Sequence, residues 1–159
     1  DTEILYNLQM ETVERRHFIP FKKEYFKKEF KIFLRDDKIR LFKAVYRGKV
    51  LSAALIIFYG REAVYHYSGS SSKFRRIPAS YLLQWEAIKE AKRRNLQVYN
   101  FWGVAHLNKP KHRFAGVSLF KRGFGGEEVN YLHAHDLVLK PKYWLIYLFE
   151  TLRKIHRRV

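Results

Sequence analysis

The sequence predicts an α/β fold in which helices lie on both faces of a mixed β-sheet, and three observations support it. Residues 50–59 form an apolar run with the length and composition of a strand that is covered from both sides. A strong helical pattern over residues 78–94 is followed by a strand pattern over residues 97–102, which is the spacing of an αβ unit. The predicted elements follow the order α-α-β-β-β-α-β-α-β-α.

Two amphipathic helices are expected first. Residues 2–17 place apolar side chains at helical spacing and end in cations, as a helix C-terminus favours, with Thr2 as the candidate N-cap. Pro20 fits the first turn of the second helix. The apolar stripe of this second helix, which we expect to face the core, consists of Phe26, Phe30, Phe33 and Leu34.

Three strands are expected next. Strands over residues 39–46 and 50–59 are joined by Arg47-Gly48-Lys49, a connection typical of a tight hairpin. A third strand over residues 63–67 follows Gly60-Arg61. The sheet is therefore predicted to begin as an antiparallel meander.

The remaining elements alternate between helix and strand. The helix over residues 78–94 is expected to turn Tyr81, Trp85, Ile88 and Ala91 inward. After the strand at residues 97–102 come a short helix near residues 114–121, a long strand at residues 127–139 and a terminal helix from Pro141, whose Trp144 is expected to pack in a core. A mixed sheet with this order of helices is of the kind found in N-acetyltransferase (GNAT)-like domains.

Length and charge limit the function classes. A chain of 159 residues with 47% hydrophobic residues is expected to fold as a single domain over residues 1–159. The 32 Lys and Arg residues against 15 Asp and Glu give a net charge of +17, which attracts nucleic acid, anionic lipid or phosphorylated substrates. The chain has no cysteine, which excludes disulfides, thiolate metal sites and a cysteine nucleophile.

The ends and the hydropathy of the chain give two further expectations. There is no uninterrupted apolar run of the roughly 18 residues that a membrane-spanning helix needs. The chain lacks an initiator methionine and opens in a helical pattern, so we expect it to be a fragment of a longer protein.

The most distinctive stretch is a pair of motifs around a polar loop. Residues 99–104 (Tyr-Asn-Phe-Trp-Gly-Val) read as a short strand that ends in glycine, and residues 116–126 read as a helical turn followed by a glycine cluster. This layout presents Lys121 just before the chain turns, which suits a cation held in a cleft. An ordinary β-loop-α connection would give the same pattern.

Other chemistries find weaker support. The Gln/Arg-x-x-Gly-x-Gly/Ala turn that holds the pyrophosphate of coenzyme A is absent, because the nearest segment, residues 123–126, follows a helix instead of opening one. His133 and His135 lie two positions apart on a predicted strand and could bind zinc together with Asp136. His106 and His112 share a loop. Histidines with either spacing more often face solvent than bind a metal ion. Residues 68–72 lack the nucleophile-elbow pattern of a catalytic serine.

Several motifs together point to a known family. They are residues 99–104, residues 120–124 (Phe-Lys-Arg-Gly-Phe), residues 64–71 (Val-Tyr-His-Tyr-Ser-Gly-Ser-Ser), residues 81–88 (Tyr-Leu-Leu-Gln-Trp-Glu-Ala-Ile) and residues 11–16, with a Thr-x-x-Arg segment. In these motifs and in their order, nearly the whole chain resembles the FemXAB family of tRNA-dependent aminoacyltransferases. Members of this family build the interpeptide bridges of peptidoglycan.

The resemblance implies an enzyme of cell-wall biogenesis and cell shape. Such a transferase takes an amino acid from aminoacyl-tRNA and joins it through an amide bond to the stem peptide of a UDP- or lipid-linked peptidoglycan precursor. No cofactor is implied, since tRNA supplies the acyl group. Family members contain two GNAT-like domains with the acceptor site between them, and this chain is similar to the second, so a missing N-terminal GNAT-like domain is expected. The implied location is cytoplasmic, at the inner face of the cell membrane.

The resemblance also implies roles for single residues. The lysine of the family's Phe-Lys motif falls on Lys121, where it would stabilise negative charge on the carbonyl oxygen as the amine attacks the ester. Phe120 would shape the aminoacyl pocket. Tyr67 and Tyr25 fall on phenols that line the acceptor site.

Further substrate contacts are implied around these residues. Arg15, Lys22 and Lys23 are alternative cations for the diphosphate of the precursor, and Gly103 closes the strand motif at the substrate site. The terminal helix, aromatic on one side and basic at its end, is a candidate for peripheral contact with an anionic membrane.

Two other functions remain open from the sequence. The first is a non-catalytic basic nucleic-acid-binding module, in which Lys121 would be one of many lysines. The second is a coenzyme A-dependent N-acyltransferase, which micromolar binding of coenzyme A would favour.

Overall fold

The computed structural model describes residues 1–16, 20–112 and 114–157, without the side chains of residues 15, 16 and 155–157. It divides into two compact units, Asp1–Gly125 and Gly126–Val159. The first unit contains α1 (Thr2–Arg16), α2 (Lys23–Leu34), β1 (Ile39–Tyr46), β2 (Lys49–Tyr59), β3 (Glu62–Ser70), α3 (Ala79–Arg93), β4 (Val98–Asn100) and α4 (Ala115–Arg122). The second contains α5 (Tyr143–Arg157).

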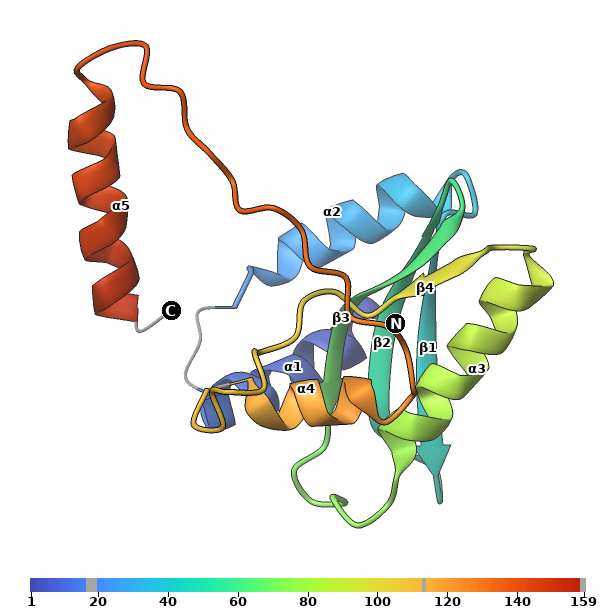
Figure 1. Ribbon diagram of the computed structural model, residues 1–159. Helices are drawn as coiled ribbons and strands as arrows, with labels where there is room; N and C mark the ends of the chain where they lie inside the picture. Colours follow the sequence, from blue (N-terminus) through green and yellow to red (C-terminus); the bar gives the residue numbers. More distant parts are fainter. Residues whose placement is uncertain (17–19, 113, 158–159) are drawn as a thin grey trace. The chain divides into compact units, whose positions relative to one another are not determined.

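The sheet of the first unit has the strand order β1-β2-β3-β4 (Figure 1). β1, β2 and β3 form the predicted antiparallel meander, and β4 joins β3 in parallel after the crossover through α3. The β1–β2 hairpin turns at Arg47 and Gly48, which both have positive φ, as a two-residue hairpin turn requires. These features confirm the mixed sheet.

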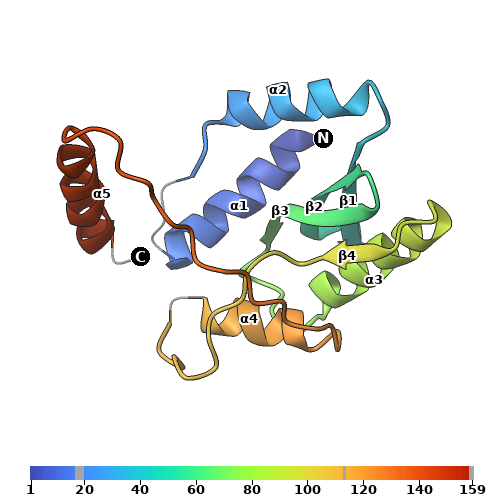
Figure 2. The ribbon, with the colours of Figure 1, turned by 45° about the horizontal axis from the view of Figure 1, so that its top comes forward.

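The core lies on both faces of β2, which is buried through most of its length. Leu55 belongs to the cluster under α1 and α2, together with Leu5 and Phe26. Ile56 points to the other cluster, under α3. Figure 2 shows α1 and α2 on one side of the sheet and α3 on the other. Helices therefore cover both faces, as predicted.

The contact between α1 and β3 is unusually close. A Cβ atom added at Gly69 would lie 2.5 Å from the Leu8 carbonyl carbon and 2.6 Å from the Gln9 nitrogen. Real Cβ atoms essentially never approach backbone atoms so closely. Glycine at this position therefore lets the helix pack directly on the strand.

The inward face predicted for α3 is partly wrong. Tyr81 and Trp85 are 46% and 55% exposed, whereas Leu83 and Ala87 are buried against the sheet. Large aromatic residues and smaller aliphatic residues each recur at helical spacing along α3. The face with the smaller side chains packs on the sheet, because it fits the narrow space above β2. The helix also starts where predicted, with Pro78 at its N-cap.

The strand predicted at residues 127–139 is wrong, because the structure gives these residues no regular secondary structure. Alternating polar and apolar residues suit a strand, but a strand also needs a neighbour to satisfy its backbone groups. Tyr131 and Leu132 are 83% and 94% exposed, and the sheet register contains no residue of this segment. The alternation alone is not enough to form the strand.

Two other boundaries differ from the prediction. Pro20 precedes α2 instead of opening it, since the N-cap is Lys22. β4 ends at Asn100 instead of residue 102, because Trp102 has a φ of +62° and its N–H donates to Asn100 Oδ1 at 2.8 Å. This turn diverts the chain from the sheet.

In the second unit, α5 carries apolar side chains that are largely exposed, including Trp144, Leu148 and Leu152. Trp144 is 58% exposed and belongs to neither core cluster, in contrast to the expected core packing. None of the described helices has the length and hydropathy that crossing a membrane would require.

Candidate active site

The site begins where β3 and β4 separate. The two strands pair over three positions, from Glu62 with Val98 to Val64 with Asn100. Beyond these pairs the chain of β4 turns at Trp102, while β3 continues to Ser70. The side chains at the open end of the two strands are therefore free to line a site.

The loop after β4 is held by α4 through a buried serine. Ser118 Oγ accepts the N–H of Ala105 at 2.7 Å and donates to the Phe114 carbonyl at 2.9 Å. Ser118 is 1% exposed, so these two bonds replace the water that its hydroxyl would otherwise bind. The short helix and the loop form one unit of structure.

Two cations of α4 complete this attachment. Lys121 Nζ donates to the Gly103 carbonyl at 2.8 Å, and Arg122 Nη2 donates to the Ala105 carbonyl at 2.8 Å. Burial lowers the pKa of Lys121, because desolvation disfavours the charged ammonium. An ammonium has three N–H donors, so the bond to Gly103 leaves two for another acceptor.

A cleft of about 560 Å³ lies beside this attachment, between the end of β3, the loop after it, the start of α3 and α4. Its lining includes Tyr65, Ser68, Ser70, Arg75, Ser80 and Phe120. No carboxylate is among the described residues that line it. Hydroxyl groups, a guanidinium and the first residues of a long helix favour an anionic ligand.

Phe120 lines the cleft, whereas Lys121 is not among its lining residues. The Phe120 ring packs on Tyr81 and Phe124, with centroids 4.8 and 5.4 Å away. This contact explains why the exposed Tyr81 is aromatic. Lys121 follows Phe120 on α4, and its ammonium is bonded to Gly103, which does not line the cleft either.

The structure brings Tyr25 and Tyr67 together, beside Glu29 of α2. The Tyr25 hydroxyl donates to Glu29 Oε1 at 3.5 Å. Burial, the nearby Glu29 carboxylate and the hydrogen bond with Tyr25 all raise the pKa of Tyr67. The phenol of Tyr67 is therefore a neutral hydrogen-bonding group at physiological pH.

The remaining predicted contacts are more scattered. Lys23 pairs with Glu3 of α1, and Lys22 is exposed at the N-cap of α2. The side chain of Arg15 lies outside the described residues. Gly103 is exposed, and nothing lies within 4 Å of an added Cβ. The backbone carbonyl of Gly103 accepts the hydrogen bond from Lys121.

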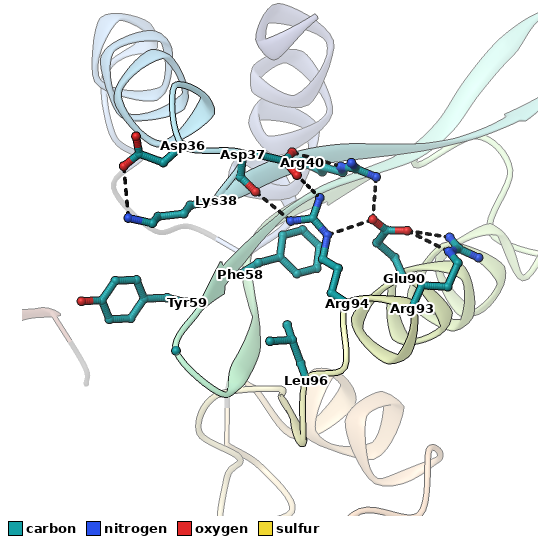
Figure 3. Close-up of a pocket in the computed structure, with 11 residues that line it drawn as sticks. Asp36, Asp37, Lys38, Arg40, Phe58, Tyr59, Glu90, Arg93, Arg94 and Leu96 are labelled. Atoms are coloured by element: carbon teal, nitrogen blue, oxygen red, sulfur yellow. Dashed lines mark hydrogen bonds and ion pairs between the residues drawn. The ribbon is translucent and has the colours of Figure 1, made fainter.

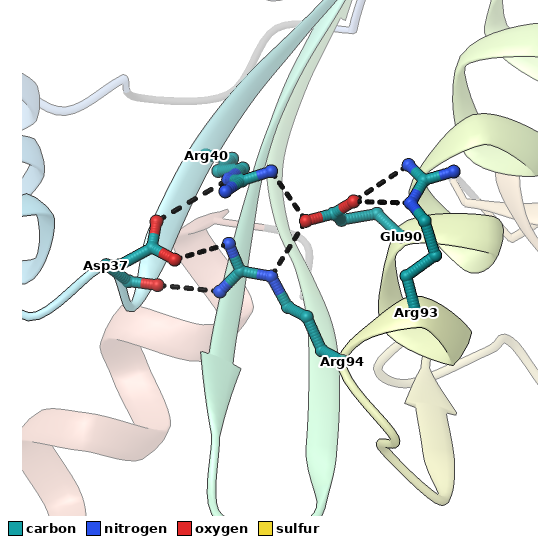
Figure 4. Close-up of polar contacts among 5 residues, drawn as sticks. All are labelled: Asp37, Arg40, Glu90, Arg93 and Arg94. Carbon is teal, nitrogen blue, oxygen red and sulfur yellow. Dashed lines mark hydrogen bonds and ion pairs between the residues drawn. The ribbon is translucent and has the colours of Figure 1, made fainter.

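A second cavity, of about 610 Å³, lies at the opposite end of α3 (Figure 3). Its centre is Glu90, which binds Arg40, Arg93 and Arg94 (Figure 4). The hydrogen bond from Arg94 is the main cause that lowers the pKa of Glu90. Arg94 also pairs with Asp37. Because the charges satisfy one another, this network ties elements together and offers no unpaired group for catalysis.

The predicted metal sites and the histidines are considered next, for the described residues only. These residues contain no group of three His, Asp or Glu side chains arranged to hold a metal ion. One histidine missed by the sequence reasoning is His66, whose Nε2 lies 2.9 Å from Glu29 Oε1. The two residues are 37 positions apart, so no local pattern indicates the pair.

Comparisons with solved structures address the fold. A predicted acetyltransferase with acetyl-CoA from Clostridium acetobutylicum has a TM-score of 0.61 and 13% identity, over 85% of this chain and 92% of that one. An aminoglycoside acetyltransferase from an uncultured soil metagenomic sample, in complex with sisomicin, has a TM-score of 0.57 and 13% identity, over 85% and 86%. At this identity the likeness shows the GNAT-like fold alone.

Comparisons with known sequences address the family. Aminoacyltransferase FemA of Staphylococcus aureus (strain MW2) is 33% identical over 110 residues, which is 69% of this chain and 26% of FemA. The match thus spans about a quarter of the length of this relative. The model of the FemAB family matches residues 37–151, which include the open end of β3 and β4, all lining residues of the cleft except Thr12, and Lys121. By this match over most of its length, the chain belongs to the FemAB family.

Proposed function

We propose that the chain is the second GNAT-like domain of a tRNA-dependent aminoacyltransferase that adds an amino acid to the stem peptide of a peptidoglycan precursor. The observation that carries the proposal is the Lys121 ammonium, which is partly desolvated and held by its bond to Gly103, next in sequence to Phe120 of the anion-favouring cleft. Membership of the FemAB family and the likeness to aminoacyltransferase FemA support it.

In this proposal the cleft receives the end of the aminoacyl-tRNA. Arg75, the hydroxyls of Ser70 and Ser80 and the start of α3 would hold its phosphodiester groups, and Phe120 would contact the aminoacyl group. The net charge of +17 supports a polyanionic donor. No cofactor is needed, because the ester of the donor already activates the acyl group.

The reaction is the aminolysis of an ester. As the amine nitrogen bonds to the carbonyl carbon, negative charge develops on the carbonyl oxygen, and the two remaining N–H donors of Lys121 would stabilise it. The oxygen of the tRNA ribose then leaves as the amide forms. Tyr25 and Tyr67 would hold the acceptor through their hydroxyl groups, with Lys22 or Lys23 near its diphosphate.

Several wider parts of the proposal rest on the whole protein. A first GNAT-like domain would complete the acceptor site, residues 1–159 would act as one domain of the pair, and the reaction would take place in the cytoplasm. The exposed apolar side of α5, with Arg153 and Lys154 near its end, would rest peripherally on the inner face of the membrane, where lipid-linked precursor is held.

Lys121→Ala tests the catalytic part of the proposal. In the full-length protein, we expect the rate of transfer from aminoacyl-tRNA to precursor to fall by about 100-fold or more, as after removal of an oxyanion donor. Affinity for tRNA should change little. Lys111→Ala, in the exposed loop before α4, is the matched control and should keep the activity.

The result also separates the alternatives. If Lys121→Ala and Lys111→Ala weaken tRNA binding equally and leave transfer intact, the basic nucleic-acid-binding module is the better description. The coenzyme A-dependent acyltransferase is favoured by the fold of the Clostridium acetobutylicum protein. Micromolar binding of coenzyme A by calorimetry would support that function against the proposed one.

A further inference from the structure

A bulge in β3 turns two neighbouring side chains towards α2. Leu55 of β2 pairs with Tyr67 and Ile56 pairs with Tyr65, so His66 has no partner in the register. Tyr65 packs with the cluster under α3, and Tyr67 packs with the cluster under α1 and α2. His66 lies with Tyr67, their ring centroids being 3.9 Å apart. Such bulges re-aim side chains, and they are frequent next to active sites.

His66 forms a largely buried pair with Glu29 of α2. Its Nε2 lies 2.9 Å from Glu29 Oε1, and the two side chains are 16% and 12% exposed. The other oxygen, Glu29 Oε2, is buried and has no hydrogen-bond partner among the described residues. A buried carboxylate with this little compensation is costly for the fold, so its presence calls for a role beyond packing.

The pair leaves one ring nitrogen available. When Nε2–H donates to a carboxylate, a neutral imidazole keeps its lone pair on Nδ1, and the structure gives His66 Nδ1 no hydrogen-bond partner among the described residues. The titratable groups around the ring are Glu29 and Tyr25 from α2 and Tyr67 from β3. Glu29 fixes the ring and would stabilise the imidazolium form once Nδ1 accepts a proton.

The pair also lies next to the residues of the candidate active site. The His66 ring centroid is 6.3 Å from that of Trp102, and the next residue, Gly103, binds Lys121. On its other side His66 contacts Tyr67, one of the two acceptor-site phenols. Ring contacts therefore connect His66 both to the segment that binds Lys121 and to the phenols proposed for the acceptor.

We infer that Glu29 and His66 form the proton-accepting pair of the transfer reaction. The inference rests on the proposed function, because that reaction needs a base. As the amine nitrogen bonds to the ester carbon, its proton passes to His66 Nδ1. When the bond between carbon and ribose oxygen breaks, the imidazolium returns this proton to the leaving oxygen, so that an amide and a free ribose hydroxyl result. Glu29 acts through His66 as a positioning residue.

The test compares transfer rates of full-length variants under single turnover. His66→Gln should lower the rate of the chemical step by about 100-fold, the lower part of the range for a general base, with KM little changed. Glu29→Gln should give a smaller loss. The wild-type rate should fall at acid pH as the imidazole takes up a proton, and His66→Gln should lose this dependence. Free imidazole should partly restore His66→Ala.

A matched control separates catalysis from packing. Glu86→Gln removes the exposed ion pair with Lys89 on α3 without touching His66 or a residue proposed to bind substrate. It should keep the wild-type rate and pH profile. Thermal unfolding of every variant shows whether a lost rate follows lost stability.

Each outcome decides the matter. Loss of rate with rescue by imidazole and a changed pH profile supports the inference. A wild-type rate and profile in His66→Gln, or losses that only follow stability and ignore imidazole, would overturn it while leaving the proposed function intact. Absence of any transfer by the wild-type protein would overturn the proposed function, and the inference would fall with it.

Discussion

Single residues hold the candidate site together. Lys121 and Arg122 attach α4 to the loop after β4, and Ser118 satisfies two backbone groups of the same region. The sequence motif predicted Lys121 at the end of a short helix, just before the glycine cluster. It did not predict the bond to Gly103, because a contact between residues 18 positions apart depends on where the loop returns.

Gly69→Ala should destabilise the fold. The added Cβ would overlap backbone atoms of Leu8 and Gln9, which cannot move without shifting α1 as a whole. We expect the free energy of unfolding in urea to fall by about 1–3 kcal/mol, as for overpacking of a core. Gly103→Ala is the control, since nothing lies within 4 Å of its Cβ and it should leave stability nearly unchanged. Equal stabilities would mean that α1 does not pack on β3 as described.

The elements were predictable to different degrees. β1 and β2 match their predicted bounds to within one residue, because the apolar run and the Arg47-Gly48 turn are local signals. The prediction of a strand at residues 127–139 was wrong, since strand pairing depends on a partner that is distant in the sequence. The bulge at His66 also has no local sequence signal. The pair that His66 forms with Glu29 was therefore not predicted from the sequence. Local pattern predicts elements, whereas tertiary contacts decide strands and sites.

The Glu90 network joins α3 to β1 and to the turn before β1, and it should be sensitive to acid. Arg94 and the other arginines lower the pKa of Glu90, so its contribution to stability is present above the ordinary pKa of the carboxyl group. This contribution is lost as pH falls through the lowered pKa. Glu90→Gln should cost about 1.5–3 kcal/mol at neutral pH, as for hydrogen bonds to charged groups, and should flatten the loss of stability in acid.

Urea unfolding at several pH values measures this effect. Glu86→Gln, on the same helix, is the control, because its pair with Lys89 is exposed on both sides and worth little. If both variants behave alike across the pH range, the network contributes nothing special to the attachment of α3.

The net charge of +17 should make binding of a polyanion by the protein depend on the salt concentration. We expect the affinity for aminoacyl-tRNA to fall linearly with salt on logarithmic axes, because bound phosphates release counterions. Filter binding between about 50 and 200 mM salt measures the slope. Arg75→Ala, in the cleft, should lower the slope by about one phosphate contact, whereas Lys111→Ala should not. An affinity independent of salt would exclude tRNA as the partner of this surface.

The bond between Lys121 and the Gly103 carbonyl has a kinetic consequence. A lysine free in solvent samples many rotamers and must be immobilised each time a substrate arrives, at a cost of up to about 2 kcal/mol in side-chain entropy. Here folding has already immobilised the charge. The positive end of the residue is thus oriented in the resting molecule, and in the proposed reaction little reorganisation would be left for the moment at which the ester carbon becomes tetrahedral.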